Sequence, residues 1–150
     1  MQFEVAITGI AELMARCRAV GANAQPLTNA AVAKVSFEIQ RDIRAEAPHR
    51  TGALQRSVLV ENMGDSAAVS ANEKYAIYVE KGTDPHVIVP VKKKALFWKG
   101  ALHPVAMVNH PGTKANPFFK RGLDKAQPYI DATFGAVRAS IIAQLAERGF

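Results

Sequence analysis

Residues 110–119, HPGTKANPFF, mark the change from a strand-rich middle of the chain to a helical C-terminal part. Asn116 suits the N-cap of the following helix, because its side-chain oxygen can accept a hydrogen bond from a free backbone amide of the first turn. Pro117 suits the first helical position, where a missing N–H costs nothing. Phe118 and Phe119 place two rings in that turn, and a ring that packs on the sheet contributes about 2 kcal/mol of burial. Only one ring can point squarely at a sheet, and Phe119 is the better candidate.

Downstream of this joint the spacing predicts a helix over residues 117–147. Its apolar stripe consists of Leu123, Ile130, Phe134, Val137, Ile141 and Leu145. Pro128 interrupts the stripe, and a proline inside a helix removes one backbone hydrogen bond, so we expect a kink close to Gln127. Arg148 and Gly149 are typical of a helix end.

Upstream of the joint, apolar residues alternate or recur at helical spacing. The pattern predicts a strand at 3–7, a helix from Thr8 to Gly21, and a second helix that stops near Ala47 before Pro48. A hairpin of strands 54–61 and 67–71 follows, and then a helical turn at 75–82 with its aromatic side inward. Further strands are predicted at 86–89, 96–98 and 105–108. This order predicts a single α+β domain over residues 1–150. An antiparallel sheet of about five strands would carry the N-terminal helices and a long C-terminal helix, with residues 84–111 as a strand-and-loop arm.

The composition is that of an ordinary globular protein, with 49% hydrophobic and 21% charged residues among 150. Nowhere does an apolar run approach the ~18 residues of a membrane span, and the first residues do not resemble a signal peptide. We therefore expect no membrane partner and a chain made in the cytosol. Cys17 is the only cysteine. It shares a helix face with Leu13 and Val20, which favours burial over a reactive role.

A net charge of +6 and a pI near 9.7 favour contact with something anionic, such as nucleic acid. The basic residues are spread along the chain, and only Lys92, Lys93 and Lys94 form a run. A solvated positive face is therefore the more common interpretation of this charge, and a dedicated binding patch is the alternative.

No pattern predicts catalysis, a cofactor or a metal. Zinc sites are usually recognised in a sequence by pairs of ligands a few residues apart. The spacing of His86, His103 and His110 is too wide for such a pair. Lys81-Gly82-Thr83 lacks the upstream glycine of a phosphate-binding loop. Ser57 and Thr51 stand in no nucleophile motif. We expect a protein that is not an enzyme.

Three blocks of sequence carry a resemblance to a known family. They are Ala47-Pro48 with Thr51-Gly52-Ala53-Leu54 and Ser57-Val58; Tyr75-Ala76-Ile77-Tyr78-Val79-Glu80-Lys81-Gly82-Thr83; and His110-Pro111-Gly112-Thr113 with Asn116-Pro117-Phe118-Phe119. Together they resemble the small neck or tail-completion proteins of long-tailed bacteriophages, which join the DNA-filled head to the tail. The resemblance runs from about Ile10 to the last helix. The arm does not match the family residue by residue.

The resemblance implies a structural virion protein of the head–tail junction, acting as a neck, tail-completion or tail-terminator component and assembled in the host cytoplasm. It implies a homo-oligomeric ring around the DNA channel, sixfold by preference and twelvefold as the alternative, with portal-side, neck or tail-tube proteins as neighbours. A basic DNA-binding module without catalysis remains the alternative function.

Site residues follow from the blocks and the arm. The motif residues expected to have structural roles are Pro48, Thr51, Gly52, Leu54, Ser57, Tyr75, Tyr78, Glu80, Gly82, Thr83, His110, Pro111, Gly112, Thr113, Pro117, Phe118 and Phe119. Glu80, the one acid in its apolar turn, is expected to accept hydrogen bonds from backbone amides or to pair with a basic neighbour. The candidate interface consists of Lys92, Lys93, Lys94, Trp98 and Met107. Trp98 could equally be an interface anchor or a core residue.

Overall fold

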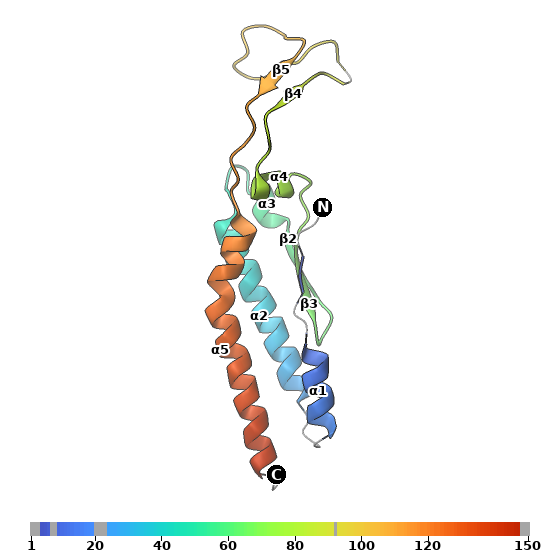
Figure 1. Ribbon diagram of the computed structural model, residues 1–150, viewed down its shortest axis with the longest axis vertical. Coiled ribbons are helices and arrows are strands. Elements are labelled where there is room, and N and C mark those ends of the chain that lie inside the picture. Colours follow the sequence, from blue (N-terminus) through green and yellow to red (C-terminus); the bar gives the residue numbers. More distant parts are fainter. Residues whose placement is uncertain (1–3, 7–8, 20–23, 92, 148–150) are drawn as a thin grey trace.

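The computed structural model describes residues 4–6, 9–19, 24–91 and 93–147. In chain order the elements are β1 (Glu4–Ala6), α1 (Ile10–Ala19), α2 (Gln25–Glu46), α3 (Ala53–Arg56), β2 (Val58–Asn62), β3 (Ala67–Ala71), α4 (Ala76–Lys81), β4 (His86–Ile88), β5 (Val108–His110) and α5 (Phe118–Glu147). Figure 1 shows an elongated body in which α2 and α5 lie side by side, with α1 and a small sheet along α2. The arm, residues 84–111, leaves the end of the body that carries α3 and α4 and extends away from it.

Helix α2 is the centre of the body. Its apolar residues at helical spacing, Val32, Val35, Ile39 and Ile43, are all at most 1% exposed. The helix ends as the sequence predicts, because Ala47 before Pro48 adopts an extended backbone with ψ 134°. The buried face of α2 packs on α5 and on strands β2 and β3.

Helix α5 is the long C-terminal helix that the sequence predicts, and it continues through Pro128 without a break. It approaches α2 most closely at Gly122, where an added Cβ would lie 2.6 Å from the backbone nitrogen of Ile43. A side chain at position 122 would therefore hold the two helix axes apart. The start of α5 lies one residue after Pro117, a difference within the usual uncertainty of helix ends.

The strands are antiparallel as predicted, but a single sheet of about five strands is wrong. Strands β1, β3 and β2 form one sheet in that order, with Val5 opposite Val69 and Val60 opposite Val69 on the other side. Strands β4 and β5 form a separate pair, in which His86 lies opposite His110. The two sheets stay apart because α4 and the base of the arm lie between them in the chain and in space (Figure 1).

Three of the predicted strands are also different in the structure. Residues 54–56 belong to the short helix α3 and not to a strand, because Gly52 with φ 72° turns the chain and places the next residues in a helical turn. In the arm, the strands expected at 96–98 and 105–108 reduce to one bridge between Leu96 and Val105, and β5 begins at Val108.

Both rings of the α5 joint are buried, so the expected contrast between them is wrong. Phe118 is 0% and Phe119 5% exposed, and their rings meet edge to face with centroids 6.3 Å apart. The first turn of α5 contacts both α2 and α4. A joint enclosed on two sides can bury two successive side chains, which a flat sheet surface cannot.

Several predictions fall outside the described residues. These are the outer strand positions Phe3 and Ile7, the cap Thr8, the helix end Gly21, and the end signals Arg148 and Gly149. The side chain of Cys17 is outside them too, so its burial stays a prediction.

Candidate assembly site

Helix α4 lies where the three motif blocks meet. Its inward side carries Ala76 and Glu80, which are 0% and 9% exposed. Tyr75 and Tyr78 are 42% and 58% exposed, so the prediction that the aromatic side faces inward is wrong. The helix is turned so that a small residue and a carboxylate contact the body, and this leaves both rings available at the surface.

Glu80 holds the start of α5. Its Oε2 accepts a hydrogen bond from the backbone N–H of Phe119 at 2.9 Å, and its Oε1 accepts one from the N–H of Lys120 at 3.2 Å. These are two of the amides that a helix leaves without an internal partner, and a carboxylate there also interacts favourably with the helix dipole. Glu80 thus has the structural role that its sequence context suggested.

Asn116 is not the cap that the sequence predicts. Its Oδ1 accepts a hydrogen bond from Nη2 of Arg121 at 2.8 Å, while its backbone N–H donates to the carbonyl of Val79 at 2.9 Å. The amides that Asn116 was expected to satisfy are bound by Glu80. The chain before α5 is therefore fastened to α4 from both directions.

The base of the arm is closed by Thr83 and Thr113. Each backbone N–H donates to the carbonyl of the other residue, at 2.9 and 3.0 Å. Gly82 and Gly112 flank this pair with φ of 75° and 87°, and a Cβ on either would collide with the opposite backbone. Glycine is therefore required at both positions, because of the positive φ and because of the close opposite backbone.

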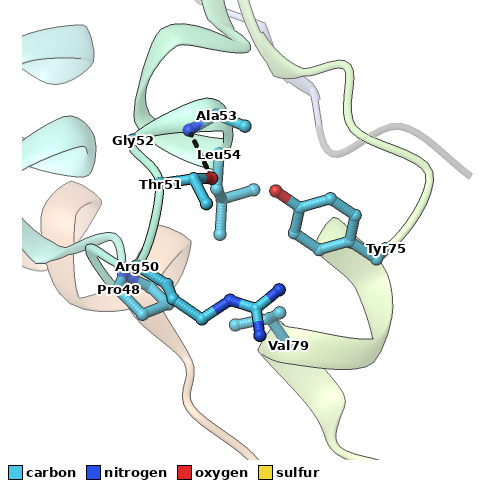
Figure 2. Close-up of a pocket in the computed structure, with 8 residues that line it drawn as sticks. All are labelled: Pro48, Arg50, Thr51, Gly52, Ala53, Leu54, Tyr75 and Val79. Carbon is cyan, nitrogen blue, oxygen red and sulfur yellow. Dashed lines mark hydrogen bonds between the residues drawn. The ribbon is translucent and has the colours of Figure 1, made fainter. Parts of the chain in front are cut away.

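A pocket of about 480 Å³ separates the first block from the second (Figure 2). It is lined by Pro48, Arg50, Thr51, Gly52, Ala53, Leu54, Tyr75 and Val79. In Figure 2 the Tyr75 hydroxyl points toward Leu54 and the Arg50 guanidinium lies beside Val79. Oxygen Oγ1 of Thr51 accepts a hydrogen bond from the N–H of Ala53 at 3.4 Å. The walls are apolar and the rim carries a cation.

A second pocket of about 660 Å³ lies on the other side of α4. Its lining joins the second and third blocks and consists of Tyr78, Gly82, Thr83, Asp84, Pro85, His86, Ile88, His110 and Thr113. Residues more than 25 positions apart thus form one concave surface, and α4 contributes Val79 to the first pocket and Tyr78 to the second. The sequence singled out most of these residues, but it did not show that they meet.

The polar groups of this region are engaged in holding the backbone. The Ser57 hydroxyl donates to the carbonyl of Leu54 at 2.8 Å. Nδ1 of His110 accepts a hydrogen bond from the N–H of Gly112 at 3.1 Å, and its ring stacks on that of His86 with centroids 5.0 Å apart. Within the described ranges no three His, Cys, Asp or Glu residues are grouped as a metal site requires. Apolar pockets with a polar rim are suited to receiving side chains of a partner.

The candidate interface residues lie on the arm, away from α4. Trp98 and Met107 are 51% and 54% exposed, which rules out Trp98 as a core residue of this chain. Lys93 and Lys94 are exposed, and Lys92 lies outside the described residues. Further exposed apolar residues of the arm are not among the predicted interface residues: Val87, Ile88 and Val89 in and after β4, and Val91, Phe97 and Leu102 beyond it. The signal of the last three was an apolar residue on each side of the lysine run, in a segment without helical or strand period.

Comparison with known proteins gives one match. A family model described as "Bacteriophage HK97-gp10, putative tail-component" matches residues 11–82. Neither the curated proteins nor the solved structures include a significant match. In the part of the chain that the structure describes, no helix combines the length and apolar character needed to cross a membrane. The match contains the first motif block and the second up to Gly82, including α4. The family resemblance is thus confirmed over residues 11–82, which are similar to the HK97-gp10-like family of phage tail components.

Proposed function

We propose that this protein is a noncatalytic component of the phage head–tail junction that forms a homo-oligomeric ring around the DNA channel. The family match supports the coarser part, a structural tail component found in the virion. The observation that carries the finer part is the joining of three motif blocks at α4. They build two concave surfaces and fix the direction of an exposed arm, which are features of a subunit that contacts neighbours on more than one side.

A ring needs one patch of each subunit to meet a different patch of the next. The body and the arm supply two unlike surfaces, because the arm projects beyond the end of the body (Figure 1). Sixfold symmetry would match a tail, and twelvefold symmetry would match a portal. The neighbours we propose are portal-side, neck or tail-tube proteins.

Electron microscopy of the purified protein, alone and with isolated tails, tests this function together with mass spectrometry of intact virions. We expect rings and a fixed copy number in particles. Protein that stays monomeric with tails or portals present, and that is absent from virions, would contradict the proposal.

The variant Trp98→Ala tests whether the arm has a role in assembly. Because its side chain is half exposed, Trp98→Ala should leave the unfolding midpoint unchanged and prevent completion of particles. Phe37→Ala is the matched control, since Phe37 is an aromatic residue of α2 that is 58% exposed. Equal effects of the two changes on particle assembly would show that the arm has no special role.

The second candidate function, a basic DNA-binding module, is favoured only by the net charge of +6 and the lysine run. Changing Lys92, Lys93 and Lys94 to Gln and titrating salt separates the two functions. DNA contact predicts a loss of duplex binding and a smaller salt slope. A structural contact predicts defective assembly with unchanged DNA binding.

A further inference from the structure

The arm carries many of the large apolar side chains that are exposed in the described residues. Strands β4 and β5 pair only with each other, and an isolated pair of strands is marginally stable in water. Val91 is 93% and Leu102 98% exposed, and other large apolar side chains extend from the strands to the tip of the arm: Val87, Ile88, Val89, Phe97, Trp98 and Met107. Exposed apolar side chains gathered in one segment of this kind mark a site that a partner covers.

The positive charge of the arm indicates the chemistry of the surface that covers it. No acid occurs between Asp84 and Asp124, whereas Lys92, Lys93, Lys94 and Lys99 lie in the arm. The covering surface must therefore combine apolar side chains with carboxylates. This excludes the pocket of Figure 2 as the receiving site on a second copy, since Arg50 lines that pocket and would meet the arm with like charge.

The outer side of β2 has the required combination. Leu59 is 47% and Met63 59% exposed, and the exposed carboxylate of Glu61 lies between them in the sequence. Because alternate residues of a strand share a face, Leu59 and Glu61 lie on one side of β2, and Met63 directly follows the strand, with Asp65 in the turn. β2 is also an edge strand of its sheet, and an edge strand can pair with an added strand.

We propose that the arm of one copy docks on the outer side of β2 in the next copy. Trp98, Phe97 and Leu102 cover Leu59 and Met63, and the lysines pair with Glu61 and Asp65. The two surfaces lie apart on one chain, with the arm beyond the end of the body and β2 on its side, so the contact joins different copies (Figure 1). It is a heterologous contact that can close a ring. The inference rests on the proposed function for the ring, and it names the two surfaces that build it.

A charge exchange tests the pairing. We expect Lys93→Glu with Lys94→Glu, and separately Glu61→Lys with Asp65→Lys, each to raise the protein concentration at half assembly by about tenfold or more. Combining all four changes should restore assembly, because opposite charges face each other again. Analytical ultracentrifugation at low and high salt measures these midpoints, and circular dichroism checks that each variant is folded.

Arg138→Glu and Asp131→Lys are the matched controls, since both residues are exposed on α5 and lie outside the two surfaces. They should leave assembly unchanged. An intermolecular disulfide between Lys94→Cys and Glu61→Cys, formed on mixing two single variants, would locate the contact directly.

The proposal is overturned if the paired reversals leave the wild-type oligomer intact, or if the fourfold variant stays as defective as its parents. It is also overturned if the arm variants lose binding to duplex DNA or to vesicles of anionic phospholipid while the oligomer is unaffected. Rings that persist in virions despite the reversals would leave the proposed function standing. An arm-dependent oligomer absent from virions would overturn the proposed function and leave this contact standing.

Discussion

The carboxylate of Glu80 in α4 binds the backbone N–H of Phe119 in α5, 39 positions later in the chain, at 2.9 Å. This bond links the second motif block to the third and fixes the first turn of α5 on the body. Both ends of the arm are attached to this joint, since the arm leaves after Gly82 and returns before Asn116. Glu80 is therefore one of the contacts that hold the base of the arm on the body.

Glu80→Ala should lower the free energy of unfolding by about 1–3 kcal/mol, because it removes the carboxylate that accepts hydrogen bonds from the N–H groups of Phe119 and Lys120. Glu80→Gln should cost less, since one amide oxygen can still accept. Urea denaturation measures both. Asp131→Ala, which removes an exposed carboxylate of α5, is the control and should change stability by less than about 0.5 kcal/mol. An unchanged free energy of unfolding for Glu80→Ala would show that the hydrogen bonds of Glu80 to the start of α5 do not stabilise the protein.

Phe118→Ala and Phe119→Ala should destabilise the protein by similar amounts, about 3–5 kcal/mol each. Both rings are at most 5% exposed, and each truncation also removes the edge-to-face contact with the other. Phe37→Ala on α2 is the control, since that ring is 58% exposed and lies outside the arm. Shifts of the urea midpoint confined to one of the two core variants would contradict the packing described.

The sequence predicted secondary structure correctly where an apolar pattern extends over many residues. The 3.6-residue period of α2, with Pro48 after it, predicted both the buried face and the end of the helix. The stripe of α5 likewise predicted a helix that is present over Phe118–Glu147. In both helices many residues support one interpretation, so a single atypical position such as Pro128 does not change it.

Prediction failed where the answer depended on distant contacts. Asn116 has the side chain of a cap, but Arg121 binds that side chain and Glu80 supplies the carboxylate from another element. Tyr75 and Tyr78 have the spacing of a buried face, yet Ala76 and Glu80 fill the narrow space against the body. Local sequence cannot show which of two faces of a short helix has room below it.

Acid should weaken the contact between α2 and α5 at Glu46. Oε2 of Glu46 accepts a hydrogen bond from Nε of Arg121 at 3.1 Å, and this bond, with the charge of Lys125 nearby, lowers the pKa of Glu46. A lowered pKa gives stability that is present above the ordinary carboxyl value and is lost as the pH falls through the folded-state pKa. Glu46→Gln should therefore lower the melting temperature at pH 7. The difference from wild type should disappear in strong acid, and a pH-independent difference would point to packing alone.

Two glycines of α5 should respond in opposite directions to the same change. Alanine is favoured over glycine inside a helix by about 1 kcal/mol, so Gly135→Ala, where an added Cβ meets nothing within 4 Å, should stabilise the protein by about that amount. At Gly122 the added Cβ would lie 2.5 Å from Cα of Ile43, and a backbone atom cannot rotate away as a side-chain tip can. The helices must separate, and overpacking of this kind costs about 1–3 kcal/mol. Gly122→Ala should therefore destabilise the protein despite its better helix propensity. Thermal unfolding of the two variants and of the double variant measures the balance, and stabilisation by Gly122→Ala would mean that α2 and α5 are not in contact there.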